Sequence, residues 1–265
     1  MPMLQPFVRE AGSGPGVVCL HGNASSSSQW RGLIELLEAT HQVFAPDSYG
    51  SGKSPDWALD REISLRDEVE FIEPVMAQAG APLTLVGHSY RAAVALMAAL
   101  ANPGRIRALV LYEPTLFAVV DIHQGPSPNG ADGIGGAVAV ASAALDTGDH
   151  DRAAEHFIDY WMGAGSWQAI PLQRKPATSD STVNIRHWSH ALFAEATPVK
   201  VCSAQSPHFV YVGESVTGIC RCRGPYPGSG APGGLRCRIS RPWPYGTGHP
   251  PGGRECVDCK VPGRG

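Results

Sequence analysis

The stretch Leu85-Val86-Gly87-His88-Ser89-Tyr90-Arg91-Ala92-Ala93 decides the fold class of this 265-residue chain. An apolar run typical of a buried strand leads into a serine, and an alanine-rich run typical of a helix follows. The middle of the stretch reads G-x-S-x-R. It differs at one position from G-x-S-x-G, the motif of the nucleophile elbow, which is a sharp turn that exposes a serine hydroxyl. Ser89 is therefore a candidate nucleophile, although a serine at such a junction is also commonly a helix N-cap.

Strand and helix patterns alternate on both sides of this stretch. Short apolar runs at 17–20, 43–45, 83–87 and 108–112 are separated by helical patterns at 29–38, 64–76 and 91–100. Ser64 and Asp67 resemble a capping box at the start of the second helix. Such alternation predicts an α/β fold, a doubly wound and mostly parallel sheet with helices on both faces.

The rhythm changes after Glu113. A Gly- and Pro-rich loop is followed by helical patterns at 137–145, 152–161 and 183–193 without a strand between them, and 207–213 returns to a strand. We therefore expect a core over 1–114, an inserted helical lid over 115–200, a core strand over 201–214 and an irregular or disordered tail over 215–265. The lid carries aromatic residues that either wall an apolar pocket or only pack the lid on the body: Phe157, Tyr160, Trp161, Trp167, Trp188 and Phe193.

The order of motifs resembles one family. His21-Gly22 follows the first strand, Asp47 and Gly50-x-Gly52-x-Ser54 follow the second, and the elbow follows the third. This order resembles the α/β-hydrolase superfamily over about residues 15–114 and again at 207–214. The resemblance implies attack by Ser89 on an ester-like or other carbonyl substrate, an acyl-enzyme, then water, with no cofactor and no metal. Epoxide hydrolases and haloalkane dehalogenases of this fold use aspartate as nucleophile, so Ser89 argues against both.

The resemblance also implies the supporting groups of the site. The backbone N–H of Asn23 or Ala24 would join that of Tyr90 in an oxyanion hole. The acid that orients the base histidine would follow a later strand, where Glu113 is the preferred residue and Glu214 the alternative. An ordinary loop and a solvated strand-end carboxylate are the competing interpretations.

Two departures from the family pattern bear on activity. Arg91 stands where the elbow favours glycine, and we expect its side chain to force the turn open. The base histidine belongs in a late Gly-His segment, and only His249, in a Pro- and Gly-rich setting, is available. His88 is next to Ser89 on a tight turn, where neighbouring side chains point apart, so it is expected to pack instead. The alternative function is therefore an inactive member that binds without turnover.

The tail differs in kind from the body. Residues 215–265 contain 12 Gly, 8 Pro and five of the seven cysteines, with a net charge of +6 against −9 for the body. Read one base later, codons for residues 242–252 permit Leu-Gly-His-Met-Gly-Pro-Val-Thr-His-Pro, which contains the missing Gly-His motif. We infer a change of reading frame near Glu214–Ser215, which the nucleotide sequence of the gene tests. Read as it stands, the tail predicts disorder or, less well, a zinc site built from Cys220, Cys222, Cys237, Cys256 and Cys259.

Composition limits the partners. The chain is 43% hydrophobic and 17% charged with a net charge of −3, which gives no reason to expect nucleic acid or an anionic membrane surface. It has neither a run long enough to span a membrane nor the features of a signal peptide at its start. A cytoplasmic location and a small, apolar substrate are therefore expected, and the sequence does not indicate an oligomeric state.

Overall fold

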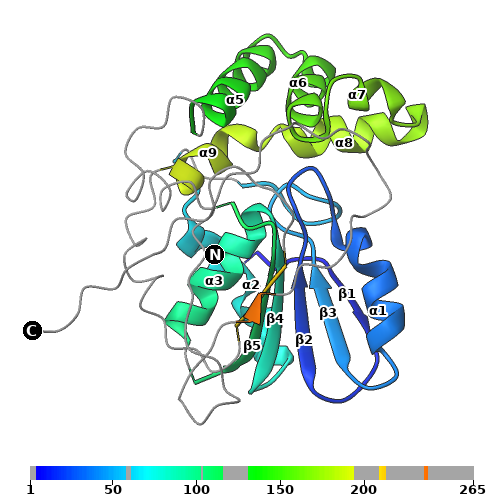
Figure 1. Cartoon of the computed structure of the whole chain (residues 1–265), viewed down its shortest axis with the longest axis vertical. Coiled ribbons are helices and arrows are strands. Elements are labelled where there is room, and N and C mark those ends of the chain that lie inside the picture. The colour runs from blue at the N-terminus through cyan, green and yellow to red at the C-terminus, as the bar shows by residue number, and fades with distance from the viewer. Residues whose placement is uncertain are drawn as a thin grey trace, which may run out of the picture.

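A seven-stranded sheet forms the centre of the computed structural model, which describes residues 4–57, 61–102, 104–115, 131–193, 209–212 and 236–237. The strand order is β1-β3-β2-β4-β5-β6-β7 (Figure 1). β1 pairs with β3 in antiparallel fashion, and every other neighbouring pair is parallel. The strands are β1 (Val8–Ala11), β2 (Gly16–Leu20), β3 (Gln42–Pro46), β4 (Leu83–His88), β5 (Ile106–Tyr112), β6 (Phe209–Val212) and β7 (Arg236–Cys237).

Helices cover both faces of this sheet. The 3₁₀ turn η1 (Ser27–Trp30) leads into α1 (Arg31–Leu37), and α2 (Leu65–Gln78) and α3 (Tyr90–Ala101) follow β3 and β4. All five residues of β2 are buried, as expected of a strand covered on both sides. Val17 and Cys19 pack with α1, whereas Val18 and Leu20 pack in the larger cluster that includes α2 and α3. The predicted doubly wound, mostly parallel sheet is confirmed.

Local sequence explains where these elements begin. The capping box predicted at Ser64 is present: its hydroxyl accepts the N–H of Asp67, and the Asp67 carboxylate accepts the N–H of Ser64. The five predicted strands lie where the apolar runs indicated, within two residues at either end. β1 was not predicted, because its four residues are only half-buried or exposed and carry no apolar run.

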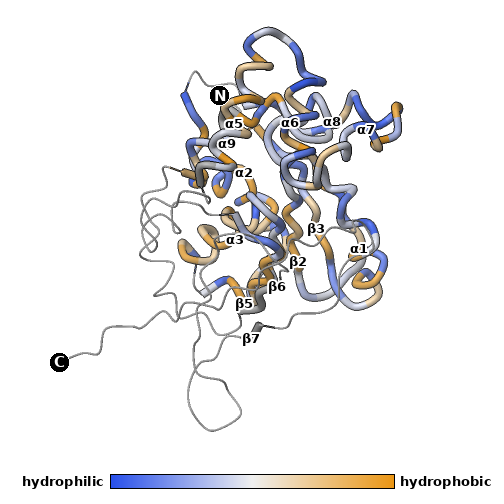
Figure 2. Tube along the Cα trace, turned by 45° about the horizontal axis from the view of Figure 1, so that its top comes forward, coloured by the Kyte–Doolittle hydropathy of each residue, from blue (hydrophilic) through white to orange (hydrophobic). Residues whose placement is uncertain are grey.

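The helices between β5 and β6 gather beyond the carboxyl ends of the parallel strands (Figures 1 and 2). α6 packs against α5, α7 and α8, and α5 also packs against α9. Helices occupy the three predicted stretches, while α7 and α8 were not predicted; whether this segment is a lid with the expected boundaries stays a prediction. These elements are α5 (Ala131–Asp146), α6 (His150–Met162), α7 (Ser166–Ala169), η2 (Leu172–Arg174), α8 (Lys175–Thr182) and α9 (Ile185–Phe193).

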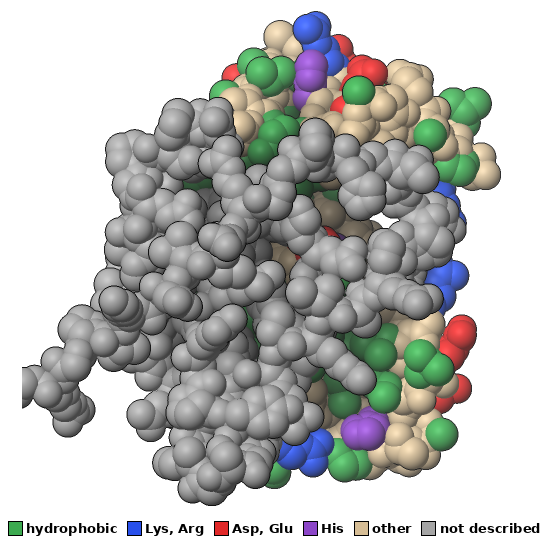
Figure 3. Space-filling model, in the orientation of Figure 1, with side chains coloured by type: hydrophobic (Ala, Val, Ile, Leu, Met, Phe, Trp, Pro, Cys, Tyr) green, Lys and Arg blue, Asp and Glu red, His purple; other side chains and the backbone are tan. Residues whose placement is uncertain are grey.

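The surface and the tail add little to the site. On the face in Figure 3, acidic and basic side chains are interspersed along the visible described edge. In the described part of the chain, no helix is both long and apolar enough to cross a membrane.

β7 is the part of the tail that the structure describes. The frame-change and zinc hypotheses fall, apart from Arg236 and Cys237, outside the described residues and stay predictions.

Candidate active site

The site lies where the strand order of the sheet reverses. From β2 the chain moves to β3 on one side, and then crosses to β4 on the other side of β2. Leu20 and Gly87 are paired in the β2–β4 ladder, so the loops that follow these two strands leave the sheet side by side. A crevice at the carboxyl ends of strands around such a reversal is the usual ligand site of an open α/β sheet.

Ser89 has the conformation of a nucleophile elbow. Its backbone has φ +54° and ψ −126°, an arrangement that L-residues rarely adopt. Its N–H donates to the carbonyl of Tyr112 at 2.9 Å, and its own carbonyl accepts the N–H of Thr115 at 3.3 Å, so the end of β5 and the residues after it hold the turn. Although Ser89 occupies the N-cap position of α3, its hydroxyl makes no capping hydrogen bond. The N-cap interpretation therefore does not account for the hydroxyl.

The elbow keeps its tight turn although Arg91 stands where the family pattern has glycine. A β-carbon on Gly87 would stand 2.6 Å from the Cα of Ala92, so strand and helix meet at the distance that only glycine permits. Arg91 is 1% exposed, and its side chain leaves the turn and runs into the body of the protein. The expectation that Arg91 would force the elbow open is wrong, because the side chain extends away from the Gly87–Ala92 contact and finds polar partners elsewhere.

The loop after β2 (residues 21–26) faces the elbow. Asn23 lines the same pocket as Ser89, and Ala24 has a left-handed backbone with φ +53°. The Gly22 N–H donates to Oε1 of Gln29 at 3.0 Å. The loop and the first residue of α3, Tyr90, are therefore both placed next to Ser89, as an oxyanion hole requires. The roles of Asn23 and Tyr90 stay predictions.

Two histidines near the elbow serve other contacts. Nε2 of the fully buried His21 accepts the N–H of Ser48 at 3.1 Å, and its Nδ1 donates to the carbonyl of Gly22 at 2.8 Å. Burial, and then the positive charge of Arg91, lower the pKa of His21 well below its ordinary value, so this ring is neutral. Nδ1 of His88 accepts the side-chain N–H of Gln29 at 3.0 Å, and its ring packs on that of Tyr112 with the ring centres 5.0 Å apart. Among the described residues, the Ser89 hydroxyl has no histidine hydrogen-bonded to it.

Glu113 directly follows β5, beside the elbow. Its φ is +47°, its side chain is one-third exposed, and its Oε2 lies 3.8 Å from Nε2 of His88. A carboxylate at this edge of the sheet can accept a hydrogen bond from the ring N–H of a base histidine. The alternative acid Glu214 and the late histidine His249 lie outside the described residues. No group of three or more metal-binding side chains occurs in the described ranges.

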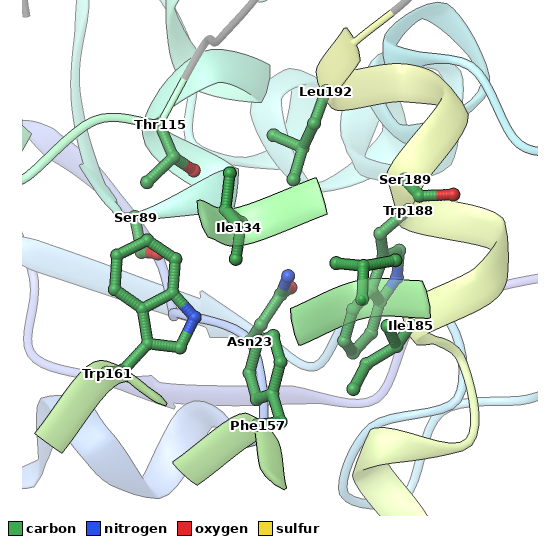
Figure 4. A pocket seen from close by; sticks show the side chains of 11 residues that line it. Asn23, Ser89, Thr115, Ile134, Phe157, Trp161, Ile185, Trp188, Ser189 and Leu192 are labelled. Carbon is green, nitrogen blue, oxygen red and sulfur yellow. The ribbon is translucent and has the colours of Figure 1, made fainter. Parts of the chain in front are cut away.

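An apolar pocket opens above Ser89 and Asn23. α5, α6 and α9 surround it (Figure 4), with the lining completed by Thr115, Ile134, Val138, Phe157, Trp161, Ile185, Trp188, Ser189 and Leu192. Of the six aromatic residues singled out in the sequence, Phe157, Trp161 and Trp188 line this pocket. Trp167 instead packs with Ala154 and Ile158, and Tyr160 is 40% exposed. The pocket-wall expectation therefore holds for three of the six, whereas Trp167 packs toward Ala24 of the body and Phe193 packs on the main core.

The pocket lining from α9 was only partly predicted. Trp188 was identified as an aromatic residue of the expected lid, whereas Ile185, Ser189 and Leu192 were not. These positions follow the i, i+3, i+4, i+7 spacing of one helix face, so a search for that periodicity toward the pocket would have found them.

Comparison with known proteins agrees with this geometry. A family model described as the alpha/beta hydrolase fold matches residues 15–143. The chain has the fold of the α/β-hydrolase superfamily. A solved relative, an alpha/beta hydrolase from Sphaerobacter thermophilus, is 23% identical, with a TM-score of 0.61 over 78% of this chain and 77% of that one. At this identity the likeness establishes the fold alone.

Two curated relatives differ in their activities. A haloalkane dehalogenase from Agrobacterium fabrum is 34% identical over 46% of this chain and 40% of its own length. A pimeloyl-[acyl-carrier protein] methyl ester esterase from Aeromonas hydrophila is 27% identical over 68% of this chain and 63% of its own length. The chain thus spans between about two fifths and two thirds of the length of these relatives. Their names give two different reactions for one fold.

Proposed function

We propose that this α/β-hydrolase cleaves an ester-like or other carbonyl substrate with an apolar acyl group, using Ser89 as the nucleophile. The observation that carries the proposal is the Ser89 hydroxyl, which makes no capping hydrogen bond to α3. It is held on a strained strand-to-helix turn at a pocket lined mainly by apolar side chains. A serine that only capped α3 would need neither the strain nor the pocket.

The reaction proceeds in two displacements. The Ser89 oxygen attacks the carbonyl carbon while its proton passes to a base, and the carbonyl oxygen becomes an alkoxide facing the backbone N–H groups of Asn23 and Tyr90. Collapse of this intermediate breaks the bond to the leaving alcohol, which takes up the proton. Water then attacks the acyl-enzyme with the same proton transfers, which releases the carboxylic acid and restores Ser89.

The proposal also concerns the acid and the base that assist Ser89. Glu113 is the preferred acid because it directly follows the strand next to the elbow, with Glu214 as the alternative. The base is left unassigned, since His21 and His88 are engaged in other contacts and His249 stands in the tail for which we infer a change of reading frame. The name of the Agrobacterium relative suggests dehalogenation as another reaction, but the serine at the nucleophile position favours acyl transfer. Action in the cytoplasm on a small molecule belongs to the same proposal.

Ester hydrolysis tests this assignment. The chain should release p-nitrophenol from p-nitrophenyl butyrate, and Ser89→Ala should lower kcat by about a thousandfold or more. Ser189→Ala is a matched control because Ser189 lines the same pocket from α9. Activity that survives in Ser89→Ala and is lost in Ser189→Ala would overturn the assignment.

Binding without turnover is the second candidate function. It is favoured by one observation: in the part of the chain that the structure describes, no histidine is hydrogen-bonded to Ser89. In that case butyrate esters would bind in the pocket, and their rate of hydrolysis would be the same in wild type and in Ser89→Ala.

A further inference from the structure

Arg91 connects the elbow to two loops and a helix of the body. Its Nη1 donates to Oδ1 of Asn23 at 2.6 Å, its Nε donates to the hydroxyl of Ser48, and its Nη2 lies 3.6 Å from Oε1 of Glu68 in α2. Arg91 and Glu68 are each 1% exposed. One side chain thus holds the loop after β2 to the loop after β3 and to α2.

The same guanidinium also contacts the pocket wall. Its central carbon lies 5.3 Å from the ring centre of Trp188 and 5.2 Å from that of Tyr90, within the range of cation–π attraction. Trp188 and Asn23 both line the pocket with Ser89. Arg91 itself does not line the pocket, so any influence on chemistry passes through the residues that it holds.

Asn23 is the residue on which this contact has a chemical consequence. Its side chain is fixed by a charge-assisted hydrogen bond, which is shorter and stronger than one between neutral groups. Its backbone N–H is one of the two proposed oxyanion donors, and such donors stabilise an alkoxide only when they are already in place. Holding the Asn23 side chain therefore restricts the backbone that carries this donor.

Glu68 explains why the arginine stays inside. A buried guanidinium without a counter-charge is strongly unfavourable, and Glu68 supplies that charge from the buried face of α2. Among the described residues, neither oxygen of the Glu68 carboxylate has a hydrogen-bond partner, so the Arg91–Glu68 contact is one of charge. Removing one member would therefore leave the other buried and uncompensated.

We infer that Arg91 is a positioning residue for the oxyanion hole, holding Asn23 and its loop against the elbow where the family pattern has glycine. The inference rests on the proposed function of Ser89 for its effect on catalysis. It does not rest on that proposal for its effect on the loop. The two effects can therefore be measured separately.

The first experiment measures the loop without turnover. Amide hydrogen–deuterium exchange of peptides that cover residues 21–26 should be about fivefold or more faster in Arg91→Met than in wild type, with α6 peptides unchanged. Arg105→Met is the matched control, since it removes an arginine from a surface ion pair with Glu73 (2.5 Å). Glu68→Gln combined with Arg91→Met removes both buried charges and serves if Arg91→Met does not fold. Unchanged loop exchange in both variants would overturn the inference whatever the activity.

The second experiment measures ester hydrolysis. Arg91→Met should lower kcat by about 10- to 100-fold while KM changes by less than about threefold, because the loss affects the alkoxide more than the bound ester. Arg91→Lys should restore part of kcat, since it keeps the charge. The double variant Asn23→Ala with Arg91→Met should have a kcat no lower than that of Arg91→Met alone, because both substitutions remove the same Arg91–Asn23 hydrogen bond.

The outcomes separate the two claims. Faster loop exchange with unchanged kcat in Arg91→Met would refute a catalytic effect of the positioning. Faster loop exchange in a chain whose wild type shows no Ser89-dependent turnover would support Arg91 as the holder of the loop and refute the proposed function. Faster exchange together with the kcat loss and the non-additive double variant supports the inference in full.

Discussion

The backbone of Gly52 lies against the carboxylate of Asp47, so closely that a β-carbon at position 52 would stand 2.1 Å from Oδ2. Asp47 is 2% exposed, and its two oxygens accept the backbone N–H groups of Ser27 (2.6 Å) and Lys53 (2.9 Å). This carboxylate therefore joins the start of η1 to the loop after β3. The G-x-G-x-S segment that marks the family in the sequence has a structural task here, which is to leave room for Asp47.

Gly52→Ala should destabilise the fold. The new methyl group would collide with Asp47, and the backbone at position 52 has φ +58°, so we expect the free energy of unfolding to fall by about 2–4 kcal/mol. Gly32→Ala is the control, because a β-carbon on Gly32 in α1 meets nothing within 4 Å. Alanine should raise stability there by about 0.5–1 kcal/mol. Urea unfolding of both variants tests this, and equal losses would refute the role given to Gly52.

The neutral state of His21 predicts how stability depends on pH. Burial, and then the charge of Arg91, lower the pKa of His21 well below 6.5 in the folded protein. The unfolded chain takes up a proton below about 6.5 and the folded one does not, so stability falls as pH drops below that value toward the folded pKa. The slope from this group is about 1.4 kcal/mol per pH unit. Glu68 acts in the opposite direction, because burial raises its pKa and its contribution is lost as pH rises.

His21→Gln should therefore flatten the pH dependence of unfolding between pH 6.5 and 4.5, the ordinary values of histidine and glutamate. Comparing this variant with wild type cancels the contribution of Glu68, which both proteins contain. Urea unfolding across this range measures the slopes, and a slope unaltered in His21→Gln would show that the ring is protonated in the folded state.

Trp161→Ala should change which acyl groups are accepted. Trp161 lines the pocket and its neighbour Tyr160 does not, although the two are 39% and 40% exposed. Removing the indole enlarges the pocket, so the ratio of kcat/KM for an octanoyl ester over a butyryl ester should rise by about tenfold. In Tyr160→Ala the ratio should stay within about twofold of wild type. A similar rise in both variants would mean that the helix, and not the pocket, controls access.

Glu113→Gln tests the choice of acid. If Glu113 orients the base, the amide should lower kcat by about 10²–10⁴-fold with little change in KM, as loss of the orienting carboxylate does in other triads. Glu214→Gln is the matched substitution at the other position that the sequence allowed, and it should leave kcat near wild type. Steady-state kinetics on p-nitrophenyl butyrate decide between them, and the reverse pattern would assign the acid to Glu214.

Much of the fold was predictable because it depends on local patterns. A strand buried on both faces needs a continuous apolar run, which β2 and β4 show, and the start of α2 needs the Ser64–Asp67 pair. The edge strand β1 was missed because one partner strand and a half-exposed surface leave it no pattern to display. Short helices such as α7 carry too few residues for periodicity.

The candidate site was predictable only where it depends on chain order. The sequence places Asn23 and Ser89 after neighbouring strands, and their meeting follows from the topology. The direction of the Arg91 side chain does not follow from its position in a motif, because it depends on Glu68 and Ser48, which are 23 and 43 residues away. A buried arginine finds its counter-charge by tertiary packing, which one sequence does not display.

Trapping the acyl-enzyme shows whether Ser89 is the nucleophile. The chain is mixed with p-nitrophenyl butyrate, quenched in acid within the first turnover, and digested for peptide mass mapping. We predict a butyryl adduct on Ser89 in wild type and in Ser189→Ala, and none in Ser89→Ala. An adduct on another residue, or p-nitrophenol release that persists in Ser89→Ala, would contradict the account.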